Sequence, residues 1–407
     1  MNTWMDVPSG SDFSIYNIPF GIYSKAGEKR IGSRIGDMVI DLESCVKLNI
    51  FPGVELPDRI WRTGYLNEFI ELGKATTRAV RSKIQEALCD ENSMLKKASH
   101  VFIPISEVEM HLPVRIGDYT DFYSSIEHAT NVGKMFRDPD NALLPNWKHL
   151  PVGYHGRSSS IVVSGTDIRR PFGQLKPQDG PPVYAATKRL DFELEMAFII
   201  GKENKLGDPI AIKDTDEYLF GMVVFNDWSA RDIQKWEYVP LGPFLAKNFA
   251  SSISPWIVTM EALQDFSVSG PKQEPEVLDY LKFEGDKNYD IKLEVGLTPD
   301  GGTENVICRS NFKYMYWNMN QQLAHHTMNG CNVRVGDMMA SGTISGPSED
   351  SFGSMLELSW SGSNPINLAN GESRTFIEDG DTITMRAYCE KGDKRVGFGE
   401  VSGKVIV

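Results

Sequence analysis

Two glutamates separated by a single residue, Glu193 and Glu195, are the first candidates for chemistry in this sequence. Apolar residues alternate with them across residues 192–198, so a β-strand would direct both carboxylates to one face, about 7 Å apart. Two like charges at that separation cost free energy unless solvent, a proton or a cation offsets them. The solvent face of an edge strand is the common explanation of such a pair. Here the apolar run continues through residues 197–200, which favours a strand that enters the core and makes a cation site the competing explanation.

A third carboxylate, Asp227, stands at the end of the apolar run 220–226, just before a predicted helix. The sequence predicts Ser229 as the N-cap of this helix, with Asp232 completing a capping box. A valine followed by a proline at 239–240 is expected to end the helix.

The same predicted helix carries Arg231, Gln234 and Tyr238 at positions i, i+3 and i+7, which places them on one face. Beside a carboxylate, this face would combine a cation ligand with donors for an oxyanion. A surface helix whose arginine pairs with an aspartate explains the same spacing, so the stretch leaves both interpretations open.

Residues 118–137 gather acidic, aromatic and basic side chains, among them Asp121, Tyr123, His128 and Arg137. Because free imidazole titrates near neutrality, His128 could serve as a general base, although a structural role is more common for any one histidine. The histidines and cysteines form no H-x-x-x-H or C-x-x-C spacing, which disfavours zinc. Carboxylate oxygens instead favour calcium or magnesium. The sequence contains neither a G-x-S-x-G elbow nor a Walker loop.

The composition restricts the partners of the protein. Its net charge of −13 argues against nucleic acid, since phosphate contacts need clustered lysine and arginine. An anionic substrate would be repelled at long range, so basic residues would have to gather locally to receive it. No apolar run approaches the roughly 18 residues of a membrane span, and the first residues do not resemble a signal peptide. The 5 scattered cysteines indicate reduced thiols, so we expect a cytoplasmic protein with no membrane partner.

The length of 407 residues predicts two domains, which we expect to span residues 1–118 and 119–407. Residues 64–98 carry helical spacing, and a second helix is predicted for residues 312–326. Short apolar runs bounded by turn residues predict strands at 160–164, 192–201, 218–226, 290–297, 338–341, 354–359, 382–389 and 396–407. The expected fold is mostly β, mixed α/β, without the regular alternation of a doubly wound sheet.

These stretches, together with residues 150–157 (LPVGYHGR) and 340–347 (ASGTISGP), resemble the fumarylacetoacetate hydrolase family from about Ser11 to Val407. The matching strings are much longer than any single short motif, so the resemblance is specific. It implies a small N-terminal SH3-like barrel, a larger C-terminal β-roll domain and a homodimer.

The resemblance also implies roles for individual residues. The implied calcium ligands are Asp121, Glu193, Glu195 and Asp227. Lys247 and Ser251 match a second position, associated with magnesium, that also involves Asp227. His128 matches the general base, and Glu357 matches the residue that orients it. The implied oxyanion-stabilising group is Arg231, Gln234 and Lys247. The implied substrate contacts are Tyr123, Arg137, Tyr154, Gln234, Tyr238 and Thr343.

One departure from the family pattern is visible. Residues 247–252 read KNFASS where the family usually has K-x-F-G-T-T. Ser251 keeps the hydroxyl group, so a magnesium ligand remains available, whereas Ala250 replaces a glycine and raises a question about the local backbone.

The resemblance implies hydrolysis of the carbon–carbon bond of 4-fumarylacetoacetate, a β-diketo diacid, to fumarate and acetoacetate, the last step of tyrosine and phenylalanine breakdown. Two alternatives remain. One is a related enzyme of the same superfamily, such as an acylpyruvate hydrolase, an oxaloacetate decarboxylase or an isomerase. The other is a non-catalytic calcium-binding protein, which the presence of His128, Glu357 and Lys247 together disfavours, since a binding module needs no base.

Overall fold

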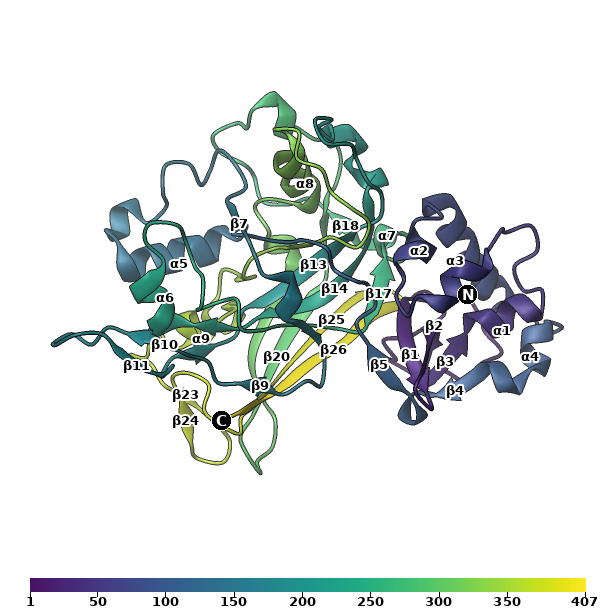
Figure 1. Cartoon of the computed structure of the whole chain (residues 1–407), viewed down its shortest axis with the longest axis horizontal. Helices are drawn as coiled ribbons and strands as arrows, with labels where there is room; N and C mark the ends of the chain where they lie inside the picture. The colour runs from purple at the N-terminus through teal and green to yellow at the C-terminus, as the bar shows by residue number, and fades with distance from the viewer.

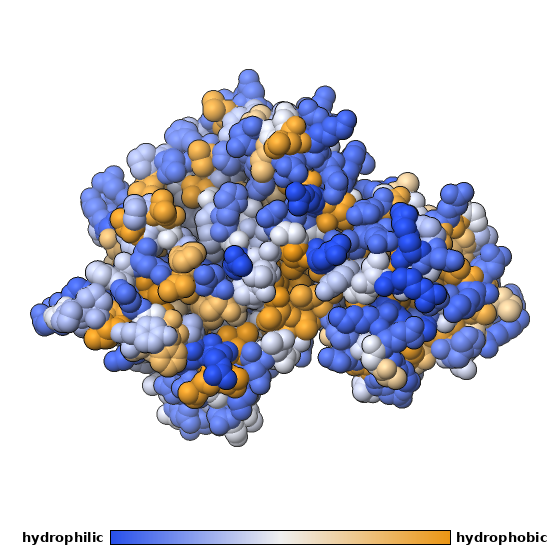
Figure 2. Space-filling model, viewed as in Figure 1, coloured by the Kyte–Doolittle hydropathy of each residue, from blue (hydrophilic) through white to orange (hydrophobic).

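The computed structural model describes residues 1–407, and the chain forms two lobes of unequal size (Figure 1). The smaller lobe contains the N-terminal part of the chain, and the larger lobe contains the remainder, including the C-terminus. Polar side chains cover most of the face seen in Figure 2, and apolar ones gather where the two lobes meet.

One sheet of 13 strands runs through both lobes. Its main path, in order of pairing, is β4 (Phe102–Pro104), β3 (Met38–Asp41), β2 (Glu28–Ile35), β1 (Phe20–Lys25), β17 (Trp256–Thr259), β14 (Leu219–Asp227), β13 (Leu194–Ile200), β22 (Met338–Ala340), β6 (Tyr119–Phe122) and β7 (Gly153–His155). Three strands branch from this path: β5 (Glu109–His111), β8 (Ile161–Val163) and β16 (Ser251–Ile253). The pairing of β1 with β17 carries the sheet from the smaller lobe into the larger one.

A second sheet, with 5 strands, lies in the larger lobe and packs on the central strands of the first through its long C-terminal hairpin. Its strands are β21 (Asn305–Asn311), β20 (Lys292–Thr298), β25 (Thr382–Lys391), β26 (Lys394–Ile406) and β9 (Ile168–Arg169). Four further pairs are β10 (Phe172–Leu175) with β11 (Val183–Ala186), β12 (Leu190–Asp191) with β15 (Ser229–Ala230), β18 (Ser267–Val268) with β19 (Asn288–Tyr289), and β23 (Ile366–Asn367) with β24 (Ser373–Arg374).

The helices are short apart from one. Those of the smaller lobe are α1 (Leu42–Lys47), α2 (Asn67–Ile70), α3 (Lys74–Cys89) and α4 (Met94–Lys97). Those of the larger lobe are α5 (Ile126–Phe136), α6 (Arg231–Glu237), α7 (Met260–Leu263), α8 (Met319–Thr327) and α9 (Met355–Leu358). No helix has the length and apolar character that crossing a membrane requires. The fold is therefore mostly β with mixed α/β character, as the sequence predicts.

The central strand β13 separates two hydrophobic cores, and all of its residues are buried. Leu194, Met196 and Phe198 belong to the core of the larger lobe. Ala197 and Ile199 lie on the opposite face and belong to a core that both lobes share. The predicted alternation is present, and the face that carries Glu195 is covered by protein, which rules out the solvent face of an edge strand.

Two predicted elements have other structures. The predicted helix at 312–326 begins instead with a single 3₁₀ turn, and α8 starts only after Asn318, which forms a capping box with Gln321. The predicted strand at 354–359 is the helix α9, because the Ser354 side chain accepts a hydrogen bond from the backbone N–H of Glu357 and so begins a helical turn.

Other predictions were partly correct. The helical spacing of residues 64–98 is divided among α2, α3 and α4, with Gly73 at the start of the longest helix. Strand β21 was not predicted.

The N-terminal strands follow the open path β4–β3–β2–β1 and continue into β17, so no closed barrel is present. The SH3-like barrel that the resemblance implies for the N-terminal domain is therefore not confirmed. The domain boundary at residue 118 stays a prediction.

One buried side chain of the smaller lobe, Asn67, connects α2 to the larger lobe. Its amide nitrogen donates to the backbone oxygens of Arg115 and Val335, each at 3.0 Å, and its amide oxygen accepts from Arg115 N at 2.8 Å. We expect Asn67→Ala to lower the free energy of unfolding by about 1–3 kcal/mol for each buried group left unpaired. Denaturant unfolding measures this loss, with Asn92→Ala as the control because Asn92 is exposed. Equal stability of the two variants would contradict the expectation.

Candidate active site

Four carboxylates from three strands of the large sheet converge on one point. Asp121 lies in β6, Glu193 directly precedes β13, Glu195 lies in β13, and Asp227 ends β14. Each offers one oxygen atom, and these atoms all lie within 4.8 Å of one another. All four side chains are buried, so surrounding protein shields the cluster from solvent. The antiparallel pairing of Leu194 with Asn226 and the parallel pairing of β22 with β6 set this arrangement.

The electrostatics of the cluster favour a bound cation. Burial, together with the charges of the neighbouring carboxylates, raises the pKa values of Asp121 and Glu195 well above the usual range, and burial also raises the pKa of Asp227. Burial acts in the same direction on Glu193, but Lys247 and Arg231 outweigh it and lower the pKa of this carboxyl.

Two oxygens of the cluster, Asp121 Oδ1 and Glu195 Oε1, are buried and have no hydrogen-bond partner. Unpaired buried oxygens are costly, and a hard divalent cation would satisfy them, because calcium and magnesium select carboxylate oxygens. The residues present therefore fit a divalent cation held by Asp121, Glu193, Glu195 and Asp227. Imidazole and thiolate groups are absent from the cluster, which is consistent with a hard ion.

A lysine and two hydroxyl groups complete the surroundings of Asp227. Lys247 Nζ lies 2.6 Å from Glu193 Oε2 and 2.8 Å from Asp227 Oδ2. Ser251 Oγ donates to Asp227 Oδ1 at 2.8 Å, and Tyr154 Oη donates to Asp227 Oδ2 at 3.2 Å. Burial disfavours the charge of Lys247, but Asp227 and Glu193 outweigh it and raise its pKa, so the ammonium group remains charged.

The alanine at position 250, where the family resemblance implies glycine, is accommodated by the local backbone. Ala250 is not among the residues with positive φ, so no left-handed conformation is required there. Ser251 begins β16 and pairs with Asp227 of β14, which holds its hydroxyl group at the cluster.

The imidazole of His128 is buried and binds Glu357. His128 Nδ1 lies 2.6 Å from Glu357 Oε2, and the positive charge that His128 can carry lowers the pKa of Glu357 against the effect of burial. Glu357 also accepts hydrogen bonds from Asn131, Ser345 and Ser354. An ionised carboxylate can only accept, so Nδ1 of His128 carries a proton, and the neutral form of this imidazole has its lone pair on Nε2.

Two helix caps hold the pair in place. Ser125 caps α5, and its Oγ accepts from the backbone N–H of His128 at 3.1 Å. Ser354 caps α9, which carries Glu357. His128 and Glu357 thus both lie in the first turn of a capped helix, where the backbone is fixed.

Arg231 lies beside the cluster with one free donor. Its Nη1 is 2.7 Å from Glu193 Oε1 and donates to Gln234 Oε1 at 3.3 Å. Its Nη2 is buried and has no hydrogen-bond partner. A buried guanidinium nitrogen without an acceptor can bind an oxygen atom of a ligand.

The predicted caps of α6 differ from the observed ones. Ala230 occupies the N-cap position, and no side chain caps the helix. Asp232 instead accepts from the side chain of Thr187 and from Lys188 N. The capping box expected at Ser229 and Asp232 is therefore wrong, because Ser229 pairs with β12 as part of β15.

Of the remaining predicted substrate contacts, Tyr123 contacts His128, whereas Arg137 and Tyr238 are exposed. The ring of Tyr123 meets the His128 ring edge-on, with centroids 5.2 Å apart. The hydroxyl of Thr343 is buried and has no partner. Arg137 is exposed and donates to the backbone oxygen of Ala142. The side chain of Tyr238 is half exposed. The structure thus does not bring Arg137 or Tyr238 into contact with the cluster.

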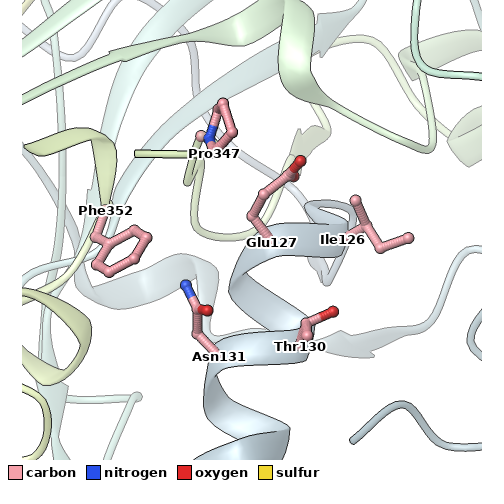
Figure 3. A pocket seen from close by; sticks show the side chains of 7 residues that line it. Ile126, Glu127, Thr130, Asn131, Pro347 and Phe352 are labelled. Atoms are coloured by element: carbon pink, nitrogen blue, oxygen red, sulfur yellow. The ribbon is translucent and has the colours of Figure 1, made fainter. Parts of the chain in front are cut away.

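Several site residues were not predicted. Asn131, Ser345 and Ser354 surround Glu357, and the backbone N–H of Gly342 donates to Glu195 Oε2 at 2.9 Å. A pocket of about 240 Å³ is lined by residues of α5, among them Glu127 and Asn131, and by Phe352 (Figure 3). Asn131 lines that pocket and donates to Glu357, and none of the four carboxylates is among the lining residues.

Comparisons with known proteins agree in pointing to one family. A family model described as "Fumarylacetoacetase N-terminal" matches residues 16–113, and one described as "Fumarylacetoacetate (FAA) hydrolase C-terminal" matches residues 118–406. The chain is 53% identical to the fumarylacetoacetase of Homo sapiens, over 99% of this chain and 98% of that protein. It is 50% identical to the fumarylacetoacetase of Dictyostelium discoideum, over 100% of this chain and 98% of that protein.

Solved structures share the fold at lower identity. The fumarylacetoacetate hydrolase from Exiguobacterium antarcticum matches with a TM-score of 0.55 and 18% identity, covering 96% of this chain and 99% of that one. The maleylpyruvate hydrolase of Sphingobium sp. SYK-6 matches with a TM-score of 0.52 and 14% identity, with the same coverage. These likenesses are evidence for the fold alone.

A divalent cation is expected to stabilise the protein, increasingly so as the pH rises. Asp121 and Glu195 have raised pKa values, so each stabilises the metal-free protein when protonated and loses that contribution as the pH rises through its raised pKa. The cation binds the ionised form and offsets this loss, by about 2.7 kcal/mol at 100 times its Kd. Thermal unfolding with calcium chloride, at about pH 5 and about pH 8, measures the effect.

Glu195→Gln is the variant for this test, and Glu91→Gln, at an exposed position, is its control. We expect the calcium-induced rise of the melting temperature to shrink in the first and to persist in the second. An equal rise in both, or a rise that is greater at the lower pH, would contradict a cation site in the cluster.

Proposed function

The chain belongs to the fumarylacetoacetase family, and we propose that it hydrolyses the carbon–carbon bond of 4-fumarylacetoacetate to fumarate and acetoacetate. Relatives named fumarylacetoacetase are 50–53% identical to this chain over nearly the whole length of both proteins. The chain is therefore a hydrolase of this type. The proposed reaction would complete the breakdown of tyrosine and phenylalanine.

The observation that carries the proposed mechanism is a buried histidine–glutamate pair in the same site as a buried acidic cluster. Lys247 and Arg231 lower the pKa of Glu193 most, and the positive charge that His128 can carry adds to their effect, which indicates that the imidazole faces the cluster. With its proton on Nδ1, His128 would take a proton from water at Nε2, and Glu357 would offset the charge that forms.

The bonds of the proposed reaction balance with water as the only co-reactant. The hydroxide formed at His128 attacks the ketone carbon through which the fumaryl group is joined to the acetoacetate part. The bond from this carbon to the acetoacetate part breaks, and its electron pair leaves as an enolate. The proton held by His128 is transferred to the acetoacetate carbon that carried the broken bond, so water supplies one oxygen of the new carboxyl group of fumarate and a hydrogen of acetoacetate.

The negative oxygen that forms during the attack needs hydrogen-bond donors. The free Nη2 of Arg231 supports a role for this residue, together with Gln234 and Lys247. Removing one such donor costs about 3–4 kcal/mol of transition-state stabilisation in comparable sites. A divalent cation, when bound by Asp121, Glu193, Glu195 and Asp227, would bind diketone oxygens and stabilise enolate charge as a Lewis acid.

Further features of the proposal rest on the family resemblance. They are Ca²⁺ as the ion of the four carboxylates, Mg²⁺ near Lys247 and Ser251, substrate contacts at Tyr123, Arg137, Tyr154, Tyr238 and Thr343, a homodimer, and a cytosolic location. Exposed apolar side chains on the β10–β11 hairpin and after α6, among them Tyr184, Leu241 and Phe244, support a homodimer, since such surface is costly in water.

The direct test is hydrolysis of 4-fumarylacetoacetate by the purified protein, followed as loss of the ultraviolet absorbance of the substrate. We expect turnover with a divalent cation, loss of turnover with a chelator, and recovery when the cation is restored. An acylpyruvate and oxaloacetate serve as comparison substrates. Turnover of either one without turnover of fumarylacetoacetate would contradict the proposed substrate.

His128→Gln is expected to lower kcat by at least about 100-fold, because glutamine cannot accept the proton of water. Calcium binding, measured by titration calorimetry, should survive, since His128 is not one of the four carboxylates. His100→Gln, at an exposed position of the smaller lobe, is the control and should retain full activity. Full activity of His128→Gln would contradict the proposed base.

A further inference from the structure

A fifth carboxylate, Asp191, lies near the proposed active site and contacts both halves of it. Asp191 is fully buried and ends strand β12, two residues before Glu193. Its Oδ2 accepts from Arg231 Nε at 2.7 Å and from Leu356 N at 3.0 Å. Its Oδ1 accepts from Met355 N at 2.7 Å. One side chain thus joins the arginine to the helix that carries Glu357.

On one side, Asp191 helps to set the plane of the guanidinium group. Asp191 holds Nε of Arg231, and Glu193 holds Nη1 at 2.7 Å. Two fixed nitrogens define the plane of a rigid guanidinium, so they also define the direction of the free donor Nη2.

On the other side, Asp191 anchors the start of α9. Met355 and Leu356 are the first two residues of this one-turn helix, and their N–H groups have no partner within it. Asp191 supplies the acceptors for both. Glu357 is the next residue and holds His128 at 2.6 Å, so a shift of α9 would move the imidazole as well.

Backbone hydrogen bonds bring the same three segments together. Arg231 N donates to Arg189 O at 3.0 Å, and Leu194 N donates to Gly353 O at 2.8 Å. Along the chain, Asp191 lies between Arg189 and Leu194. Its side chain adds hydrogen bonds to the same two segments, namely the start of α6 and the start of α9.

We propose that Asp191 is a positioning residue that holds the guanidinium of Arg231 and the His128–Glu357 pair at a fixed separation. This inference rests on the proposed hydrolysis, in which one group binds the developing oxyanion and the other activates water. Asparagine cannot replace Asp191, because its amide nitrogen would face at least one of the three N–H groups that now meet a carboxylate oxygen.

We expect Asp191→Asn to lower kcat by about 10- to 100-fold and to change KM by less than about 3-fold, since misplaced groups weaken the transition state more than the bound substrate. Asp381→Asn is the matched control. Asp381 is also fully buried, binds Arg374 through Nε at 2.9 Å and Nη2 at 3.1 Å, and accepts from a backbone N–H. If Asp191 has only a structural role, both variants should lose stability and keep the kcat of the folded fraction.

A double-mutant cycle identifies the groups through which Asp191 acts. The loss caused by Asp191→Asn should shrink in the background of Arg231→Lys and also in that of Glu357→Gln. Losses that multiply independently in both backgrounds would overturn the proposal, as would an unchanged kcat in Asp191→Asn.

A spectroscopic measurement tests the same point without turnover. The proton between His128 Nδ1 and Glu357 should give a far-downfield proton resonance in the wild-type protein. We expect this resonance to shift or disappear in Asp191→Asn and to remain in Asp381→Asn. An unchanged resonance in Asp191→Asn would count against the proposal even if the wild-type protein failed to hydrolyse fumarylacetoacetate, a failure that would refute the proposed function separately.

Asp191→Glu provides a second variant in case the asparagine variant does not fold. It keeps the charge beside Arg231 but displaces the carboxylate relative to α9. A positioning role predicts a kcat at least about 10-fold lower than that of the wild type. Wild-type kcat in this variant would show that charge alone suffices, and would overturn the proposal.

Discussion

The accumulation of buried negative charge at one point of the large sheet is the constraint on which the rest of the site depends. Five buried carboxylates, Asp121, Asp191, Glu193, Glu195 and Asp227, lie close to two cations, the buried Lys247 and Arg231, whose side chain is 8% exposed. Removing either cation would leave an uncompensated charge in a low-dielectric interior. Lys247 and Arg231 are consequently held by several contacts each, and the divalent ion that the cluster fits would supply the remaining positive charge.

The sheet makes this concentration of charge possible because β13 is covered on both faces. One face of β13 packs into the core of the larger lobe, and the other packs into a core to which the smaller lobe contributes. Apolar burial on both sides offsets the cost of placing charges at the end of the strand. The smaller lobe therefore contributes to the site without supplying any of the four clustered carboxylates, because it closes the face on which Glu195 lies.

The parts of the site that follow from local patterns were predictable from the sequence. The period-2 alternation predicts that Glu193 and Glu195 lie on one face, and the end of an apolar run predicts that Asp227 ends a strand. Asp121 joins them through the parallel pairing of β22 with β6, a long-range contact that no local pattern encodes and that only the family resemblance indicated. Residues 354–359 predict a strand because six partly apolar residues fit either period, whereas the cap at Ser354 favours a helix. Asp191 lies two residues before Glu193 and so continues the same alternation of acidic residues. This spacing is the signal in the sequence from which Asp191 could have been predicted as a site residue.

The wide spacing of the site residues along the chain has a consequence for biosynthesis. His128 and its partner Glu357 are 229 positions apart along the chain. A growing polypeptide therefore contains His128 and the four clustered carboxylates long before Glu357 and strand β26 are synthesised. A fragment that stops before Glu357 would contain His128 and the four carboxylates but would lack the carboxylate that binds the imidazole.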